Sequence, residues 1–328
     1  MQDALYPLRF APIFKPAIWG GTALRPMFGQ AGSAEAEGEA WVLSDQGDSQ
    51  SVVAEGPLKG RTLRELMVTH EREILGDASL SAGRFPLLLK FLDARQALSV
   101  QVHPDDHRAK LMEPSSAGLG KTEAWVILQK DPGALLYSGL KKGVDSAAFQ
   151  SALQGGTLPD VMHTFSPDIG DCVFLEAGTI HAIGAGLLLF EVQQTSDITY
   201  RLYDWGRVDA RTGKPRQLHI EQSLTCTDVE RGPCGPVRPL PIAGEKREQL
   251  VSCRYFTLDR HQGSEPMTVG ASGQCRIAVA VEGKATLEHA GTKYPMKPGD
   301  VILLPATIGP ATITPHGNAT ILECGPAA

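Results

Sequence analysis

Gly170-Asp171-Cys172-Val173-Phe174-Leu175-Glu176-Ala177-Gly178-Thr179-Ile180-His181 is the stretch of this sequence that decides the fold. A glycine–aspartate turn leads into an apolar strand, and a second glycine turn leads to a histidine. The order of turn, apolar strand and turn returns at Gly299-Asp300-Val301-Ile302-Leu303-Leu304-Pro305-Ala306-Thr307, where no histidine follows. This faint repeat predicts two related β units, of which only the first keeps a metal-ligand histidine.

Short apolar or alternating runs surround this stretch and predict further strands. In the first two thirds of the chain they are Phe85–Leu92, Ala97–His103, Glu123–Gln129, Ala134–Gly139, Cys172–Glu176, Leu187–Gln193 and Ile198–Trp205. In the last third they are Arg276–Glu282, Lys284–His289 and Val301–Pro305. Their even spacing, together with 35 glycines and 23 prolines, is typical of a β sandwich or barrel rather than of an α/β sheet.

Helices are few. The clearest predicted helix runs from Leu58 to Leu75, within a helical segment near residues 58–77, with Thr62 as N-cap and Glu65 completing a capping box. A weaker one runs from Asp145 to Leu153 and would end at Gly155-Gly156.

A proline-rich stretch, residues 232–245, is the best candidate for a linker. It would divide the chain into a catalytic domain over residues 1–231 and a C-terminal β domain over residues 246–328.

Composition excludes several classes of protein. The net charge of −6 gives no support for nucleic-acid binding, and no apolar run reaches the length of a membrane helix. The stretch Met1 to Phe14 lacks the basic-then-apolar order of a signal peptide, so we expect a cytoplasmic protein. Six scattered cysteines without a C-x-x-C pair predict reduced thiols rather than a disulfide framework.

Polar residues alternate along Ser99-Val100-Gln101-Val102-His103, so Ser99, Gln101 and His103 share one face of a strand. Three neighbouring polar side chains are costly in a core unless a metal or ligand satisfies them. The alternative is an ordinary strand with this face in solvent.

Lys121 and Glu123 also point one way, at the start of the next predicted strand. A carboxylate can complete a zinc shell, and a lysine can hold a phosphate or move a proton. The alternative here is a surface ion pair at a strand end. A lone histidine such as His181 is usually not a ligand, but its spacing from the Gly170-Asp171 turn matches the second signature of cupins.

Seven segments in order resemble the type I mannose-6-phosphate isomerases, in their short bacterial form within the cupin superfamily. The match is strong over residues 7–224 and weak beyond. The segments are Phe14-Lys15-Pro16-Ala17-Ile18-Trp19-Gly20-Gly21, Gly38-Glu39-Ala40-Trp41-Val42-Leu43-Ser44, Leu89-Lys90-Phe91-Leu92-Asp93, Ser99-Val100-Gln101-Val102-His103-Pro104-Asp105-Asp106, Gly120-Lys121-Thr122-Glu123-Ala124-Trp125, Gly178-Thr179-Ile180-His181-Ala182 and Ser196-Asp197-Ile198-Thr199-Tyr200-Arg201-Leu202-Tyr203-Asp204. Thr122 stands where many members have proline.

The resemblance implies a mainly β fold of two cupin-like β-barrels or jelly rolls, the second degenerate, with a few short helices. It implies one zinc ion (Zn2+) per chain, held by Gln101, His103, Glu123 and His181. Arg201 matches the family's active-site arginine, and Asp197 lies four residues before it. Ser99 and Lys121 match positions associated with the sugar phosphate.

The expected reaction interconverts D-mannose 6-phosphate and D-fructose 6-phosphate through an enediol, whose charge a bound cation and Arg201 would stabilise. Lys121 is the leading phosphate or acid/base residue, but a zinc-bound hydroxide, Glu123, Lys121 and Asp197 all stay open as the carbon base.

Other classes are a non-catalytic sugar-binding cupin and a cupin oxygenase. Retention of Lys121, Glu123 and Arg201 argues against the former, and Gln101 at a ligand position argues against the latter. A cupin glucose-6-phosphate isomerase is the nearest competitor. The partner is a small sugar phosphate, with neither nucleic acid nor membrane, and the assembly is a monomer or a homodimer.

Overall fold

The computed structural model describes residues 4–33, 35–113, 118–209, 212–242 and 246–327. Residues 1–3 of the N-terminal stretch and 243–245 of the predicted linker lie outside the described residues.

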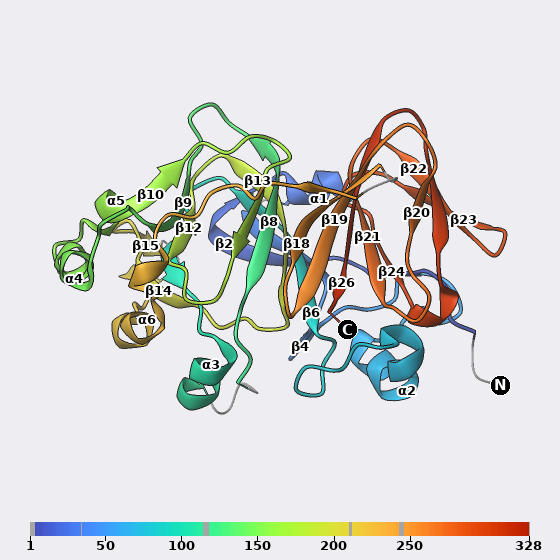
Figure 1. Cartoon of the computed structure of the whole chain (residues 1–328), viewed down its shortest axis with the longest axis horizontal. Coiled ribbons are helices and arrows are strands. Elements are labelled where there is room, and N and C mark those ends of the chain that lie inside the picture. Colours follow the sequence, from blue (N-terminus) through green and yellow to red (C-terminus); the bar gives the residue numbers. More distant parts are fainter. Residues whose placement is uncertain (1–3, 34, 114–117, 210–211, 243–245, 328) are drawn as a thin grey trace.

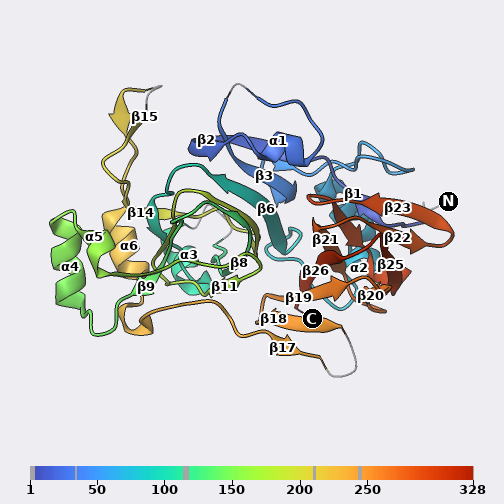
Figure 2. The same ribbon diagram turned by 90° about the horizontal axis from the view of Figure 1, so that it is seen from above.

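Two β units lie side by side, each made of two sheets (Figures 1 and 2). The N-terminal β unit contains a six-stranded sheet in the order β11-β8-β13-β6-β2-β3 and a five-stranded sheet in the order β10-β9-β12-β7-β14. The six strands are Cys172–Leu175, Glu123–Lys130, Leu187–Gln194, Leu87–Ala94, Ile13–Gly21 and Glu37–Leu43. The five are Met162–Phe165, Leu136–Leu140, His181–Ile183, Val100–Val102 and Tyr200–Tyr203.

The C-terminal β unit contains a seven-stranded sheet in the order β1-β24-β21-β26-β19-β18-β17 and a four-stranded sheet in the order β20-β25-β22-β23. The seven strands are Leu8–Arg9, Val301–Leu304, Arg276–Glu282, Ala319–Pro326, Phe256–Gly263, Arg247–Ser252 and Leu240–Pro241. The four are Met267–Val269, Ala311–Pro315, Ala285–His289 and Thr292–Met296. Two small hairpins join β4 to β5 (Asp45–Gln46, Ser49–Gln50) and β15 to β16 (Val208–Asp209, Lys214–Pro215). The prediction of a mainly β protein built from jelly-roll sheets is confirmed.

Helices are short and peripheral in the described residues. They are α1 Leu24–Met27, α2 Leu63–Leu75, α3 Asp106–Met112, α4 Ser146–Gln154, α5 Leu158–Val161 and α6 Ile220–Cys226, with 3₁₀ turns η2 Val229–Arg231 and η3 Ala306–Ile308. In Figure 1, α4, α5 and α6 flank the N-terminal β unit, and α2 lies beneath the C-terminal one. No helix in these parts of the chain combines the length and the apolar character that crossing a bilayer requires.

The helix predicted from Leu58 begins later, at Leu63. Thr62 has extended backbone angles (φ −81°, ψ 156°) and forms the predicted capping box with Glu65, so the helix cannot extend toward Leu58. The second predicted helix is confirmed as α4, with Asp145 as N-cap and Gly155 after its last residue.

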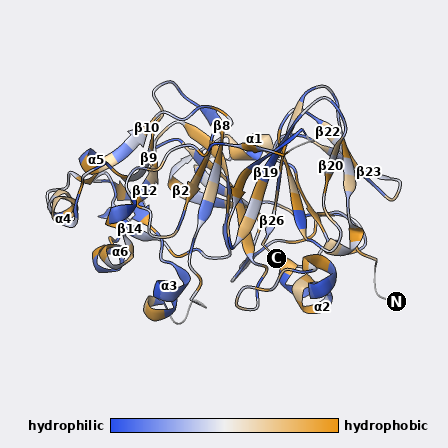
Figure 3. Ribbon diagram, viewed as in Figure 1, coloured by the Kyte–Doolittle hydropathy of each residue, from blue (hydrophilic) through white to orange (hydrophobic). Residues whose placement is uncertain are grey.

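The largest apolar core lies between the two β units and belongs to both. From the N-terminal β unit it takes Phe91 and Phe190, which are fully buried, and from the C-terminal β unit Phe256 and Leu322, also fully buried. Figure 3 shows apolar residues along the strands of both units, while α2 carries apolar and polar residues on different faces. Each unit therefore stabilises the other through a buried sheet face.

Segments on both sides of the predicted domain boundary pair with strands of the other β unit. β1 pairs with β24, with Leu8 opposite Leu303, so an N-terminal segment completes the C-terminal sheet. Within the predicted linker, β17 pairs with β18, and Pro233 and Pro236 form isolated bridges to the N-terminal β unit. The division into domains at residues 232–245 stays a prediction.

All six cysteines are free thiols, as predicted. Cys172, Cys226, Cys275 and Cys324 are buried, and burial raises the pKa of Cys172 to about 12. These thiols are inert components of the core.

Candidate metal centre and active site

Four predicted ligands converge inside the N-terminal β unit from strands of both of its sheets, β7 and β12 in the five-stranded sheet and β8 in the six-stranded sheet. Gln101 lies on β7, His103 directly follows it, Glu123 begins β8, and His181 begins β12, where it pairs with Gln101. Ligand atoms of His103, Glu123 and His181 all lie within 4.8 Å of one another. The amide Nε2 of Gln101 lies 3.3 Å from Nε2 of His181.

Both histidines are oriented by backbone carbonyl groups. Nδ1 of His103 lies 2.8 Å from the carbonyl oxygen of Ile198, and Nδ1 of His181 lies 2.8 Å from that of Thr179. Because a carbonyl only accepts, each Nδ1 donates, and each Nε2 keeps its lone pair for the cluster. Burial lowers the pKa of His181 to about 4 and that of His103 well below its ordinary value, so both rings are neutral, as metal ligands must be.

The donor set fits a divalent cation. Glu123 is fully buried, and its Oε1, 3.4 Å from Nε2 of His181, has no hydrogen-bond partner in the described residues. A buried carboxylate oxygen without a partner is costly unless a cation satisfies it. Two imidazoles, a carboxylate and an amide make a mixed nitrogen–oxygen shell without thiolate. Ser99 and His103 are buried, so the alternative that the polar face of the strand Ser99 to His103 lies in solvent is wrong.

Lys121 completes the cluster. Its Nζ lies 2.7 Å from Oε2 of Glu123 and 3.1 Å from Nε2 of His103, and the side chain is buried. The alternative of a surface ion pair at this strand end is therefore wrong. Its buried amino group, beside the proposed ligands, is placed to act on a bound molecule.

Two buried charges that were not predicted as site residues extend this network. Lys90 and Glu191 face each other across β6 and β13, with Nζ 3.7 Å from Oε1, and Lys121 lies 3.9 Å from the same oxygen. Burial alone would lower the pKa of Lys90, but the carboxylates of Glu39, Glu191 and Asp197 outweigh burial and raise it. The sequence signal was available, because each charge interrupts an apolar strand, LLLKFLDA or LLLFEVQQ.

Asp197 is placed at the edge of this network rather than in the metal cluster. Its side chain is 57% exposed, and its Oδ1 lies 3.7 Å from Nζ of Lys90. Asp197 is thus linked to Lys121 through Lys90 and Glu191.

Arg201 lies on β14, opposite Gln101 on β7. Its Nε donates to Oγ of Ser99 at 3.1 Å, and its Nη1 donates to the carbonyl oxygen of Gln217 at 2.9 Å. Burial and the neighbouring Arg216 lower the pKa of Arg201, but a guanidinium stays charged at neutral pH. The structure thus brings two of the three predicted substrate residues, Ser99 and Arg201, into contact beside the ligand strand, while Lys121 lies in the metal cluster.

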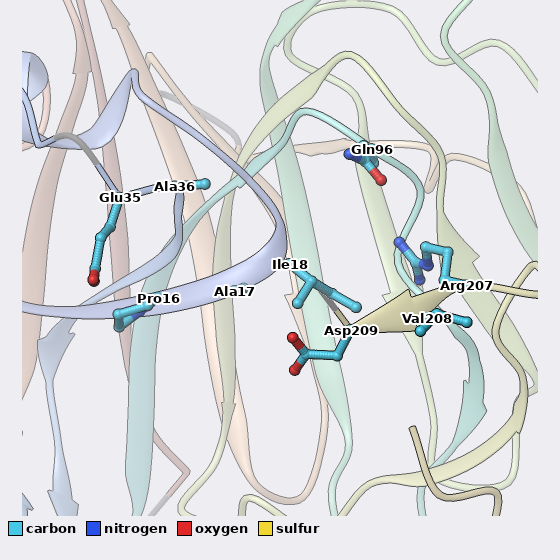
Figure 4. A pocket seen from close by; sticks show the side chains of 9 residues that line it. All are labelled: Pro16, Ala17, Ile18, Glu35, Ala36, Gln96, Arg207, Val208 and Asp209. Atoms are coloured by element: carbon cyan, nitrogen blue, oxygen red, sulfur yellow. The ribbon is translucent and has the colours of Figure 1, made fainter. Parts of the chain in front are cut away.

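A separate cavity of about 510 Å³ lies between β2 and the β15–β16 hairpin (Figure 4). Its lining is Pro16, Ala17, Ile18, Glu35, Ala36, Gln96, Arg207, Val208 and Asp209. None of the predicted site residues lines it, so it is distinct from the metal cluster.

Comparisons with known proteins show the family of the chain. The chain matches the model of the type I phosphomannose isomerase catalytic domain over residues 8–120, which contain Gln101 and His103. Residues 246–322 match the model of the mannose-6-phosphate isomerase cupin domain. Glu123, His181 and Arg201 lie outside both matched segments.

Relatives match over nearly the whole length. Mannose-6-phosphate isomerase ManA of Bacillus subtilis is 37% identical over 92% of this chain and 94% of its own. A mannose-6-phosphate isomerase of Streptococcus mutans is 35% identical over 89% of this chain and 90% of its own.

A solved structure agrees in sequence and in shape. The crystal structure of a mannose 6-phosphate isomerase from Bacillus subtilis is 33% identical, covers 97% of this chain and 99% of its own, and superposes with a TM-score of 0.87. Sequence and fold agree over both β units, and the chain belongs to the type I phosphomannose isomerase family.

Proposed function

We propose that this isomerase interconverts D-mannose 6-phosphate and D-fructose 6-phosphate through an enediol, with one zinc ion per chain. The observation that carries the proposal is the buried convergence of His103, Glu123 and His181 beside Lys121. Family membership supports the substrate class, because the relatives named above are mannose-6-phosphate isomerases.

Gln101, His103, Glu123 and His181 would hold the zinc ion. When bound there, zinc would act as a Lewis acid on the oxygens at C1 and C2 of the sugar. The hydrogen bonds from Nδ1 of both histidines to backbone carbonyls fix the rings, so this shell is preorganised.

The reaction moves a proton between C1 and C2, so the site needs a group that holds the proton near both carbons. Lys121 is that group in this proposal, because its Nζ is buried next to the ligands. As a neutral amine it would take the proton from one carbon, and as the ammonium so formed it would return the proton to the other. Asp197 stays the alternative, since its exposed carboxylate reaches the buried chain of charges through Lys90.

Arg201 and Ser99 bind the charged part of the substrate. A guanidinium can contact phosphate or enediolate oxygens with two parallel N–H groups, and the Ser99 hydroxyl lies in reach of its Nε. Arg201 lies on β14 opposite Gln101, and Ser99 directly precedes β7, so substrate and metal would meet on one face of the sheet.

The test is turnover of mannose 6-phosphate before and after chelation, with elemental analysis of the protein. We expect activity to disappear with the metal and to return with added zinc. Glucose 6-phosphate is assayed separately, because a cupin glucose-6-phosphate isomerase is the nearest competitor. Full activity in metal-free protein, or faster turnover of glucose 6-phosphate, would contradict the proposal.

The proposed location is the cytoplasm, and the proposed assembly is a monomer or a homodimer. Both proposals rest on the sequence alone. Cell fractionation tests the location, and light scattering tests the assembly.

A further inference from the structure

The carboxylate of Asp106, the first residue of α3, accepts hydrogen bonds from both β units. Its Oδ1 accepts from the backbone N–H of Gly120 at 2.8 Å and from Nε2 of Gln194 at 2.9 Å. Its Oδ2 accepts from the hydroxyl of Tyr255 at 2.7 Å and from Nη2 of Arg254 at 3.0 Å. None of these groups has a role in the proposed chemistry.

The Oδ1 side of this arrangement holds the segment that carries Lys121. Gly120 is bound directly by Asp106. Thr122, on the other side of Lys121, donates its backbone N–H to Oε1 of Gln194 at 2.9 Å, while Gln194 donates in turn to Asp106. The backbone is therefore fixed immediately before and after Lys121, one residue short of Glu123.

Gly120 shows how closely the segment that carries Lys121 approaches the segment from Pro104 to Asp106. A Cβ at this position would lie 2.6 Å from the backbone nitrogen of Asp106 and 2.9 Å from the carbonyl oxygen of Pro104, both of them main-chain atoms. The same carbonyl accepts from the backbone N–H of Lys121 at 3.0 Å. Two segments packed this tightly transmit a displacement of one to the other.

The Oδ2 side is bound from the C-terminal β unit. Arg254 and Tyr255 lie in the turn between β18 and β19, and the Arg254 guanidinium stacks on the Tyr255 ring at 4.5 Å. The next residue, Phe256, is fully buried in the shared core and contacts Phe174 of β11 edge to face. The donor to Asp106 is therefore mounted on a rigid part of the other unit.

We propose that Asp106 is a positioning residue for Lys121 and Glu123, and that Tyr255 lets the C-terminal β unit take part in catalysis through Asp106. The inference rests on the proposed function, because it deepens the role of Lys121. It differs from a purely covering role for the C-terminal β unit, since it makes one hydroxyl of that unit matter for turnover.

The kinetic test compares Tyr255→Phe, Asp106→Asn and the double variant, each loaded with zinc. Loss of a group that orients metal ligands typically costs 10- to 100-fold. We expect kcat to fall roughly 10-fold in Tyr255→Phe and roughly 10- to 100-fold in Asp106→Asn, with smaller changes in KM, because Ser99 and Arg201 are untouched. The double variant should stay within about twofold of Asp106→Asn, because Tyr255 acts only through Asp106.

Tyr6→Phe is the matched control. The Tyr6 hydroxyl donates to the carbonyl oxygen of Glu55 at 2.8 Å and accepts from the backbone N–H of Leu58 at 3.0 Å, away from the Lys121 segment. Its loss removes the same chemical group and should leave kcat unchanged.

A second readout does not depend on activity. Hydrogen–deuterium exchange at the amides of Gly120 and Thr122 should be faster in Asp106→Asn and in Tyr255→Phe than in the parent and in Tyr6→Phe. If the parent fails to turn over mannose 6-phosphate, the proposed function falls, while the exchange data still decide whether Asp106 holds this segment.

Three results would overturn the inference. The first is a Tyr255→Phe variant whose kcat and amide exchange equal those of the parent. The second is an Asp106→Asn variant that melts at a lower temperature but keeps the kcat and amide exchange of the parent. The third is a double variant whose loss of kcat is the sum, in free energy, of the two single losses. If Asp106→Asn does not fold, Tyr255→Phe decides alone, because it removes a single hydroxyl from a partly exposed ring.

Discussion

Nδ1 of His181 donates to the backbone carbonyl of Thr179, and its Nε2 faces Oε1 of Glu123 with a free lone pair. Replacing it with alanine removes one of the three ligands whose atoms lie within 4.8 Å of one another. We expect His181→Ala to lose most of its zinc and its turnover, as measured by elemental analysis and by isomerase assay. Full metal retention with activity would refute the ligand assignment.

Two other histidines serve as controls for that variant. His289 lies on β22, and His316 contacts Oγ1 of Thr286 at 3.0 Å, both in the C-terminal β unit. His289→Ala and His316→Ala should leave zinc content and turnover unchanged. If either variant halves the zinc content while remaining folded, a second metal site exists in that unit.

Arg201 has a different proposed role, which is to bind the charged part of the substrate rather than the metal. Arg201→Ala should reduce kcat by about 100- to 1000-fold, the usual effect of losing one preorganised electrostatic contact, with zinc content unchanged. Arg95→Ala removes an exposed guanidinium that pairs with Asp131 outside the site and should match the parent. A rate for Arg201→Ala within about threefold of the parent would show that this cation is only structural.

The convergence of His103, Glu123 and His181 could be predicted from the sequence, because the family resemblance implied the ligand set and strand alternation placed its polar side chains on one face. Lys90 and Glu191 were missed, although each is a single charge in an apolar run. What the sequence does not contain is their pairing, since Lys90 meets Glu191 only once β6 and β13 are aligned in register.

At the scale of elements, α2 depends on its first turn. The hydroxyl of Thr62 accepts from the backbone N–H of Glu65 at 3.1 Å, and Oε2 of Glu65 accepts from that of Thr62 at 2.8 Å. Thr62→Ala should lower the free energy of unfolding by about 1 kcal/mol in a urea titration, while Thr62→Ser should stay close to the parent. An equal loss in both variants would mean that the capping hydroxyl contributes nothing.

Some elements were predictable and others were not. β21 has the bounds that its apolar pattern predicted, and α4 begins and ends where Asp145 and Gly155 indicated. β2 was not predicted, because its sequence IFKPAIWGG contains a proline and two glycines, and these residues favour a turn in a local sequence pattern. It is a strand because neighbouring β3 and β6 supply its partners, which is tertiary information.

At the scale of the whole molecule, the shared core makes each β unit depend on the other. Phe256 is fully buried in that core. Phe256→Ala should therefore cost about 3 to 5 kcal/mol of unfolding free energy. The control Leu240→Ala, at a side chain that is 59% exposed, should be within about 0.5 kcal/mol of the parent.

Deleting residues 246–328 extends the same argument. It would expose the apolar face of β6 and β13 to water, so we expect aggregation rather than a soluble, inactive fragment. A monodisperse fragment in light scattering, or equal stability of the two point variants, would contradict a shared core.

The sequence did not reveal this interface. Strands such as β6 are apolar on both faces, so their pattern cannot say which face meets its own unit and which meets the other.

The pairing of β1 with β24 has a consequence for synthesis. Leu8 leaves the ribosome long before Leu303, its partner. This edge of the C-terminal sheet can therefore close only once residue 303 has been made, and until then the segment of Leu8 must remain without its partner while the chain grows. Such long-range closure is slow and exposes unpaired strand edges, so this protein should depend on chaperones during synthesis more than its modest size suggests.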